Sequence, residues 1–220
     1  MPEQKNPRGA FIQRDKTTYA IVPRTPVGLV TPEFLENVAR VAKKHEIPII
    51  KITSGQRLAL VGLKPEIIDD VWADLGMDAA PAVGLCVHYV KACPGTEVCR
   101  FGVRDSLGLG LRLEKLLVGV EMPGKVKIGV SGCPNNCSEA YVRDIGLFGK
   151  AKGWTLIIGG TSARKPRIGD VIAEQLTDDQ AVELVQKHLE YYKNNAKPKE
   201  RTARFIERIG IEAFKNAVLG

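Results

Sequence analysis

Apolar residues in the first third of the chain recur with the spacings of short strands and helices. Residues 16–23 (KTTYAIVP) contain several β-branched and aromatic residues, which predicts a strand. Thr31 then offers an N-cap, Pro32 a proline at the first helical position and Glu33 an early acid, so a helix should begin there. The apolar face of that helix would consist of Phe34, Val38 and Val41.

Two strands and a second helix complete this segment. They are predicted at residues 47–53, at residues 56–61, and from Pro65 through Trp72 to about residue 75. The run GMDAAP at 76–81 contains Gly, Ala and Pro and no periodic pattern, so it is the predicted linker. We therefore expect one domain at residues 1–76 and another at residues 77–220.

The second segment mixes strands and helices as well. Recurring leucines predict a helix from Ser106 to Val118, and apolar runs predict strands at 126–130, 145–148 and 154–158. Thr177 and Gln180 form a capping box, which should start a helix with Val182, Val185, Leu189 and Tyr192 on one face. The polar run at 193–200 ends this pattern, and a final amphipathic helix is predicted over residues 199–219. The fold class is therefore α+β.

Composition and charge narrow the class of protein. The chain has 220 residues, 44% of them hydrophobic and 26% charged, as in ordinary globular proteins. No apolar run reaches the roughly 18 residues of a membrane span, and the polar N-terminus has no signal-peptide core, so we expect a cytoplasmic protein. The net charge is +7, but the bases are not clustered, which argues against nucleic acid. An anionic cofactor or substrate, or an acidic electron carrier, would explain the excess of bases.

Four of the five cysteines form two close pairs. Cys93 and Cys99 have the spacing C-x5-C, and Cys133 and Cys137 have the spacing C-x3-C. Because structural disulfides are disfavoured in the cytoplasm, such pairs predict metal ligands: either an iron–sulfur cluster or zinc. Zinc knuckles prefer C-x2–4-C, which only the second pair satisfies. Cys86 lies in the apolar run VGLCVHYV and is predicted to be a buried small residue.

The residues inside the pairs support the cluster. Pro94, Gly95, Pro134 and Asn135 permit turns in which backbone amides face the sulfurs. Thiols without any cofactor are disfavoured, because both pairs lie in Gly- and Pro-containing loops. The histidines are weaker candidates as metal ligands: His45 and His188 fall on predicted helices, where we expect them to face solvent, and His88 lies near the first loop.

Residues 85–160 resemble the sirohaem and [4Fe-4S] half of the sulfite and nitrite reductases. The pattern C-x5-C … C-P-x-N-C, followed by GLFGK and a Gly-Gly turn, carries this resemblance, and ITSGQRLALVG resembles the ferredoxin-like half-domain of the same family. The chain is most similar to the small, single-repeat, assimilatory-type sulfite reductases. The resemblance implies a ferredoxin-like half-domain at 1–76 followed by a sirohaem and [4Fe-4S] α+β domain, with C-terminal helices, at 77–220.

The resemblance also implies the cofactor ligands. Cys93, Cys99, Cys133 and Cys137 would hold a [4Fe-4S] cluster. In this family the last cysteine also binds the sirohaem iron, so Cys137 would be the shared ligand. The shared thiolate would couple the two redox centres directly.

Basic residues are expected around the substrate anion and around the sirohaem carboxylates. Lys125 and Lys127, in a P-x-K-x-K segment, and the arginines Arg57 and Arg100 are the candidates for substrate binding and catalysis. We expect Arg57 to replace the arginine that relatives carry at position 55, because residues 55 and 57 would share one side of a strand. The candidates for contacts with the macrocycle are Gln56, Asn135, Arg164 and Arg167.

The resemblance predicts a six-electron reduction of sulfite to sulfide. Electrons would come from an external, acidic one-electron carrier such as a ferredoxin, because nothing in the chain resembles a flavin or nicotinamide site. Three alternatives stay open: reduction of nitrite to ammonia, a non-enzymatic iron–sulfur electron carrier, and a zinc-stapled interaction module. A homodimer would supply the half that the two-repeat relatives carry in one chain, whereas a monomer would have a more open active site.

Overall fold

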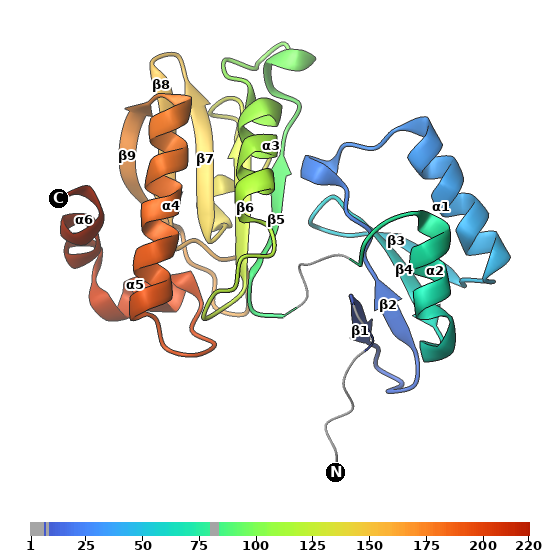
Figure 1. Cartoon of the computed structure of the whole chain (residues 1–220). Coiled ribbons are helices and arrows are strands. Elements are labelled where there is room, and N and C mark those ends of the chain that lie inside the picture. The colour runs from blue at the N-terminus through green and yellow to red at the C-terminus, as the bar shows by residue number, and fades with distance from the viewer. Residues whose placement is uncertain (1–6, 8, 80–83) are drawn as a thin grey trace. The chain divides into compact units, whose positions relative to one another are not determined.

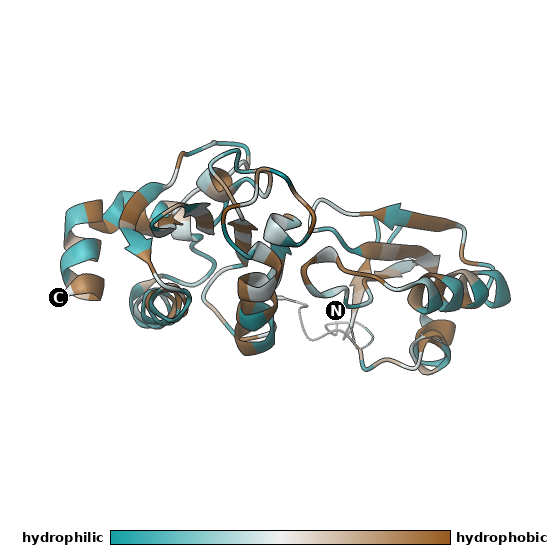
Figure 2. Ribbon diagram, turned by 90° about the horizontal axis from the view of Figure 1, so that it is seen from above, coloured by the Kyte–Doolittle hydropathy of each residue, from teal (hydrophilic) through white to brown (hydrophobic). Residues whose placement is uncertain are grey.

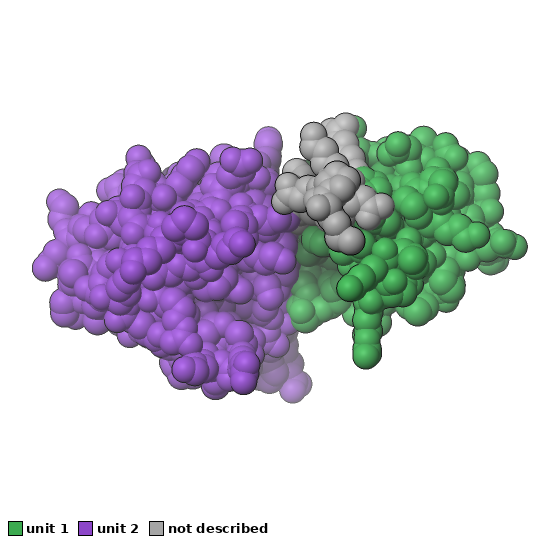
Figure 3. Space-filling model, turned by 90° about the horizontal axis from the view of Figure 1, so that it is seen from below, with its two compact units in different colours: residues 1–83 green, residues 84–220 purple. Residues whose placement is uncertain are grey.

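Two compact units, residues 1–83 and residues 84–220, make up the chain (Figure 3). The computed structural model describes residues 7, 9–79 and 84–220. The predicted linker at 76–81 falls partly outside these residues. Within it, Gly76 has a left-handed backbone and ends a helix, while residues 80 and 81 are not described.

Unit 1 is a four-stranded antiparallel sheet with two helices (Figure 1). The strand order is β1-β2-β4-β3, with β1 at Ala10–Ile12, β2 at Tyr19–Ile21, β3 at Ile49–Ile52 and β4 at Leu58–Leu63. The helices are α1 at Pro32–Lys44 and α2 at Ile68–Leu75, the latter preceded by a 3-10 turn at Pro65–Ile67.

The start of α1 is as predicted. The Thr31 side chain accepts a hydrogen bond from the Phe34 amide at 3.2 Å, which satisfies one of the unpaired amides of the first turn. Val38 and Val41 are buried in a core that also includes Leu60 and Trp72. The capping residue therefore predicted the start of the helix, and the apolar spacing predicted the face that packs into the core.

The strand predicted from Gln56 begins later. Gln56 has a φ of +58°, and the Thr53 amide donates to the Arg57 carbonyl at 2.8 Å, so residues 53–57 form the turn between β3 and β4. The expectation that residues 55 and 57 share one side of a strand is therefore wrong, because the strand starts only at Leu58. Strand β1 was not predicted.

Unit 2 is a five-stranded sheet with helices. The strands, in the order β5-β6-β7-β8-β9, are β5 at Val87–Ala92, β6 at Val126–Ser131, β7 at Ile145–Lys150, β8 at Gly153–Ile158 and β9 at Asp170–Leu176. Strands β5, β6 and β7 are parallel, and β8 and β9 are antiparallel to their neighbours. The helices are α3 at Ser106–Leu117, α4 at Asp178–Asn195, α5 at Thr202–Ile209 and α6 at Ile211–Leu219.

Helices α3 and α4 cover one face of this sheet (Figure 1). The Asp105 carboxylate caps α3 by accepting from the Gly108 amide at 2.8 Å, and the predicted capping box of Thr177 and Gln180 starts α4. Both helices turn an apolar side to the sheet, and the two-toned ribbon of α4 in Figure 2 shows this division. None of the described helices combines the length and the apolar character needed to cross a bilayer.

The segment that follows the second cysteine pair runs over the opposite face. A Cβ atom on Gly129 of β6 would lie 2.5 Å from the Ser138 carbonyl oxygen, and one on Gly146 of β7 would lie 2.1 Å from the Ala140 carbonyl oxygen. Side chains larger than hydrogen cannot fit at these two positions. The two glycines therefore let backbone lie directly on the sheet.

Several elements differ from the sequence predictions. The final helix is two helices, because Gly210, with a φ of +84°, separates α5 from α6. Strands β5 and β9 were not predicted. Cys86 is buried, as expected, directly before β5.

Candidate iron–sulfur and anion site

The sheet topology brings the two cysteine pairs to one edge. Cys93 follows the last residue of β5, and Cys133 comes two residues after the last residue of β6. These strands are parallel neighbours, so their carboxyl ends lie side by side. The Cys93 amide donates to the Val130 carbonyl at 3.1 Å, which extends the pairing as far as the first cysteine.

The two cysteine loops touch through their backbones at Gly132. The amides of Val103 and Arg104 both donate to the Gly132 carbonyl, at 2.9 and 3.0 Å. A Cβ atom on Gly132 would lie 2.8 Å from the Gly95 Cα atom and 2.7 Å from the Arg104 carbonyl oxygen. Because these contacts are made by backbone atoms, the distance between the loops is fixed by the absence of a side chain at Gly132.

Two polar groups lie against one of the sulfurs, and one of them donates a hydrogen bond to it. The Gly132 amide donates to Cys93 Sγ at 3.1 Å, and the buried Ser106 Oγ lies 3.3 Å from the same sulfur. Ser106 Oγ also donates to the Cys93 carbonyl at 2.8 Å. Hydrogen bonds of this kind stabilise a thiolate and tune the potential of a cluster bound to it.

Asn136 shapes the second loop, and the sequence analysis did not select it. It has a φ of +55°, which Asn tolerates better than most residues. Its Oδ1 accepts from the Ala140 amide at 2.9 Å and from Ser131 Oγ at 3.2 Å. An Asn between two cysteines of a tight loop was the available signal. The neighbouring Asn135 is exposed.

A group of basic and aromatic side chains occupies the amino end of β6. Lys127 is paired with Tyr89 of β5, and its Nζ lies 6.0 Å from the centre of the Tyr89 ring. Arg143 is buried and donates to the Tyr89 hydroxyl at 2.9 Å. Burial lowers the pKa of Lys127, and the charges of Arg201, Arg143 and Lys125 lower it further. Lys125 is exposed, one residue before the strand.

Asp144 organises this basic group. It is almost fully buried, and its carboxylate accepts from Arg201 Nε at 3.1 Å, from Thr202 Oγ1 at 2.7 Å and from the Lys127 amide at 3.0 Å. The charge of Asp144 partly offsets the lowering of the Lys127 pKa. Asp144, Arg143 and Arg201 were not selected from the sequence, because nothing in the local pattern marks a charged residue as buried.

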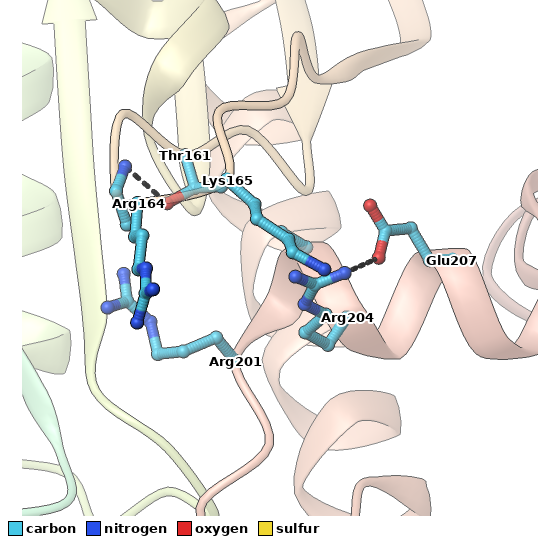
Figure 4. A pocket seen from close by; sticks show the side chains of 8 residues that line it. Thr161, Arg164, Lys165, Arg201, Arg204 and Glu207 are labelled. Carbon is cyan, nitrogen blue, oxygen red and sulfur yellow. Dashed lines mark hydrogen bonds and ion pairs between the residues drawn. The ribbon is translucent and has the colours of Figure 1, made fainter.

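Arg164 lines a basic pocket between the loop after β8 and α5 (Figure 4). The cavity has a volume of about 310 Å³, and its basic residues are Arg164, Lys165, Arg201 and Arg204. Glu207 is the acid among the lining residues, and it accepts from Arg204 at 2.6 Å. Cations therefore outnumber acids in the pocket. Lys165, Arg201 and Arg204 were not among the sequence candidates.

Arg167 makes structural contacts. Its guanidinium donates to the Gly159 carbonyl at 2.9 Å and pairs with Asp170 at 2.5 Å. These contacts hold the Gly159-Gly160 turn against the start of β9.

The candidates from unit 1 lie in the β3–β4 turn. Gln56 is half-buried, and its Oε1 has no hydrogen-bond partner among the described residues. Arg57 is half-buried beside it, and its amide donates to Thr53 Oγ1 at 3.2 Å. In unit 2, Arg100 is exposed and its guanidinium stacks 4.6 Å from the centre of the Phe101 ring.

Two histidines differ from expectation. His188 is fully buried against Tyr192 and Phe214 rather than facing solvent. His45 is largely buried, and its Nε2 lies 2.6 Å from an Asp74 carboxylate oxygen. His188 lies on the inner side of α4, and His45 lies at the end of α1. A helix predicted from the sequence does not reveal which of its sides packs against other elements. His88 Nε2 bonds to the Gly84 carbonyl at 2.7 Å.

Two family models match the chain. Residues 83–220 match the nitrite and sulphite reductase 4Fe-4S domain, and residues 11–77 match the nitrite/sulfite reductase ferredoxin-like half domain. The chain belongs to the nitrite and sulfite reductase family. The resemblance deduced from the cysteine pattern is thereby confirmed.

Relatives within this reductase family differ in length. The chain is 58% identical to an assimilatory-type sulfite reductase of Nitratidesulfovibrio vulgaris, over 97% of this chain and 98% of the relative. It is 41% identical to a nitrite reductase [NAD(P)H] of Bacillus subtilis, of which it spans 26%. Among solved structures, the Mycobacterium tuberculosis NirA protein has a TM-score of 0.82 at 16% identity, over 97% of this chain and 45% of that chain, which shows a shared fold.

The reductase cysteines fit a [4Fe-4S] cluster. In the described part of the chain, no three histidine, cysteine or acidic side chains converge on a position for a single metal ion. A cubane binds each thiolate through a different iron, so its ligands need not converge in this way. Cys133 is buried, Cys93 and Cys99 are half-buried, and Cys137 is exposed. Cys137 is thus the most exposed of the four.

Proposed function

We propose that this protein reduces sulfite to sulfide. The observation that carries the proposal is the meeting of two cysteine loops at the carboxyl ends of β5 and β6, with a backbone amide already aimed at one sulfur. The close similarity in sequence and length to an assimilatory-type sulfite reductase supports the choice of substrate. The balanced reaction is HSO3⁻ + 6 e⁻ + 6 H⁺ → HS⁻ + 3 H2O.

The cysteines would hold both redox centres. Cys93, Cys99 and Cys133 would bind the [4Fe-4S] cluster, and Cys137 would bind both the cluster and the sirohaem iron. Together these cofactors supply electrons singly to the sulfur of the bound anion. The Gly132 amide would stabilise the charge on the Cys93 sulfur, and Ser106, which donates to the Cys93 carbonyl, would hold that residue in place.

The basic residues would bind the anion and deliver protons. Lys125, Lys127 and Arg57 are the proposed substrate ligands. Arg100, the fourth candidate, is exposed and stacks on Phe101, so we assign it to the outer surface of the first cysteine loop and not to the substrate. Because its pKa is lowered, Lys127 releases the proton on Nζ more readily than an ordinary lysine does. Such a group suits a reaction in which three oxygens leave as water. The Asp144–Arg201 pair would keep the amino end of β6 in place.

The basic pocket offers a site for carboxylates. Arg164 would bind sirohaem carboxylates there, together with Lys165, Arg201 and Arg204, because carboxylates are the natural partners of convergent guanidinium groups. Gln56, Asn135 and Arg167 are the other proposed contacts with the macrocycle. The unpaired Oε1 of Gln56 leaves a polar atom ready for such a contact.

Electrons would come from a separate protein. We propose an acidic one-electron carrier such as a ferredoxin, because the net charge of +7 favours an acidic partner. The cytoplasm is the proposed compartment, since five free cysteines and a cluster require reducing conditions.

We also propose a homodimer in which each copy supplies bases to the cofactors of the other. Lys127 lies about 13 Å along β6 from Ser131, beyond which the cysteine loop begins. Cys133 thus follows the far end of β6 from Lys127, whereas the chain after Cys137 returns over Gly129, two residues from Lys127. Chain length supports a second copy: the solved NirA structure is more than twice as long as the part that this chain matches, and a second copy would supply the remainder.

Sedimentation of the cofactor-loaded protein tests the dimer. The expected result is a mass of about 48 kDa, twice the 24.0 kDa chain, with specific activity falling on dilution through the dissociation range. A monomer that keeps full specific activity at all concentrations would contradict this arrangement.

Absorption spectroscopy tests the function itself. Protein purified without oxygen, from cells that make sirohaem, should show chlorin-type bands that shift when sulfite is added after dithionite. A spectrum of iron–sulfur type alone would favour a non-enzymatic carrier, and a colourless zinc protein would favour an interaction module. Either outcome would overturn the proposal.

Nitrite reduction is the second candidate, and the 41% identity to a nitrite reductase favours it. Both anions are small and would suit a pocket of lysines and arginines. Competition between the two anions, measured as the ratio of kcat/KM values with one electron donor, separates the candidates. We expect the ratio to favour sulfite.

A further inference from the structure

The loop that carries Cys99 presents apolar side chains to solvent. Val98 is 81% exposed, Phe101 52% and Val103 46%, and Val98 is the most exposed large apolar side chain in the described part of the chain. We call these three residues, with the exposed Arg100 that stacks on Phe101, the Val98 patch. A contiguous apolar patch on a monomer surface commonly marks an interaction site.

The backbone under the Val98 patch is held firmly. The Cys99 amide donates to the Gly95 carbonyl at 3.0 Å, and the Gly102 amide donates to the Cys99 carbonyl at 2.9 Å. The Val103 amide is tied to Gly132 of the second cysteine loop. The apolar side chains therefore face outward from a fixed loop, where a partner can bind without first ordering it.

The charges around the patch are mainly positive. Arg104 donates to the carbonyls of Lys150 and Ala151, at 3.2 and 2.8 Å, so the exposed turn with Lys152 lies beside the loop. There are thus three bases in this region, Arg100, Arg104 and Lys152. They outnumber the two acids, Glu97 and Asp105. The Asp105 carboxylate is already bonded to the Gly108 amide. An apolar centre with a basic rim complements a partner with an apolar centre and an acidic rim.

We propose that the Val98 patch is the docking site of an acidic, one-electron carrier protein. This inference rests on the proposed function, which requires an external donor. Cys99, a proposed cluster ligand, lies between Val98 and Arg100 in the chain, so a carrier bound here reaches the cluster through a single cysteine side chain. The basic pocket of Arg164 and Arg204 is lined by the loop that follows Ile158, which pairs with Ile145 at the amino end of β7, so it lies at the opposite end of the strands from Cys93 and Cys133.

A charge pair at one exposed position tests the site. In the cofactor-loaded protein, Val98→Glu should lower the second-order rate of sulfite reduction driven by a reduced acidic ferredoxin by about tenfold at low salt. Val98→Lys removes the same apolar side chain but keeps the sign of the surface, so it should lose clearly less of the rate than Val98→Glu. Gln186→Glu, an exposed position on α4, carries the same charge change away from the patch and should have no effect.

Dye-driven activity separates docking from catalysis. With reduced methyl viologen, which needs no protein docking site, all three variants should match the wild-type protein. Equal ferredoxin-driven rates for Val98→Glu and wild type would overturn the docking site while leaving the reductase intact. A change in sedimented mass for Val98→Glu would instead show that the patch joins two copies, which also overturns it. Absence of dye-driven sulfite reduction in the wild type would refute the proposed function itself.

Discussion

Single residues decide the chemistry of the cysteine site. Gly132 supplies an amide to one sulfur, and its carbonyl anchors the other loop, so one residue without a side chain serves both loops. Ser106 joins the same sulfur to the start of α3. Neither residue is a ligand, yet both set the surroundings in which a thiolate must be stable.

Replacement of Cys133 should abolish the cluster. Cys133→Ser removes one of four proposed thiolates, and a serine hydroxyl is a poor substitute for a soft sulfur ligand. Iron and acid-labile sulfide per chain should fall severalfold, while far-ultraviolet circular dichroism stays close to wild type. The control is Cys86→Ala, which changes a buried cysteine outside the pairs and should leave the iron content unchanged.

His188 should destabilise the protein in acid. Burial without a hydrogen-bond partner among the described residues lowers its pKa to about 3, whereas an unfolded histidine titrates near 6.5. Between these values the unfolded state binds the extra proton, so stability is lost as pH falls, by about 1.4 kcal/mol per pH unit.

A variant isolates this contribution. In urea unfolding, His188→Leu should gain stability relative to wild type as the pH falls from 7 to 5, and the difference between the two proteins should be constant above pH 7.5. A difference that is independent of pH would contradict the assignment.

Elements are positioned by contacts that single residues cannot make alone. Strands β5 and β6 bring the cysteines together because they are parallel neighbours, although residues 93 and 133 are far apart in the chain. Segment 133–142 can cross the sheet only over the glycines of β6 and β7. The site is therefore a property of strand order and of backbone contacts between loops.

Gly132→Ala should prevent the cysteine loops from closing. The added Cβ would meet backbone of the first cysteine loop at two places, Gly95 and Arg104, at under 3 Å, which backbone atoms cannot relieve by a rotamer change. We expect iron content to fall severalfold after reconstitution. Gly210→Ala is the control: nothing lies within 4 Å of its added Cβ, so it should cost only the strain of its positive φ, about 1–3 kcal/mol, and keep the cluster.

The Asp144 carboxylate should be the main link between the sheet and the C-terminal helices. Asp144→Asn leaves Arg201 without its buried counter-charge, which typically costs about 3–5 kcal/mol. Glu207→Gln, which weakens the exposed pair with Arg204, should cost less than about 1 kcal/mol. Equal effects of the two changes in chemical denaturation would contradict the structural role of Asp144.

At the scale of the whole molecule, each unit has its own core. The core of unit 1 includes Leu60 and Trp72, and that of unit 2 includes Trp154, whose Nε1 donates to Asp178 at 2.7 Å. The chain has two tryptophans, one in each unit. Trp72→Phe and Trp154→Phe therefore give proteins whose remaining fluorescence reports one unit at a time.

Cofactor removal should lower the unfolding midpoint of both units. A ligand that binds only the folded state stabilises whatever it contacts. The cysteines lie in unit 2, so the larger shift should come from Trp154 fluorescence. A smaller shift should also come from Trp72 fluorescence, because Gln56 and Arg57 of unit 1 are proposed contacts. An unchanged Trp72 midpoint would contradict those two assignments.

The sequence predicted the local features well. The N-cap of α1, the capping box of α4 and strands β6 to β8 were correct, because caps and apolar periodicity act over a few residues. The errors include two boundaries at residues with positive φ: β4 starts after a turn at Gln56, and Gly210 divides the last helix. Strand β5 was missed because a short apolar run does not distinguish strand from helix without its neighbour.

The sequence by itself determined the cysteine spacing, and with it the kind of cofactor and the family. It also determined where most helices begin, since capping groups are local. Only the tertiary structure decided which side chains surround the cysteines and which charges are buried. Asp144, Arg143 and Arg201 meet because strand order and the path of the C-terminal segment bring them together. Burial depends on packing between distant segments, and no window of the sequence contains that information.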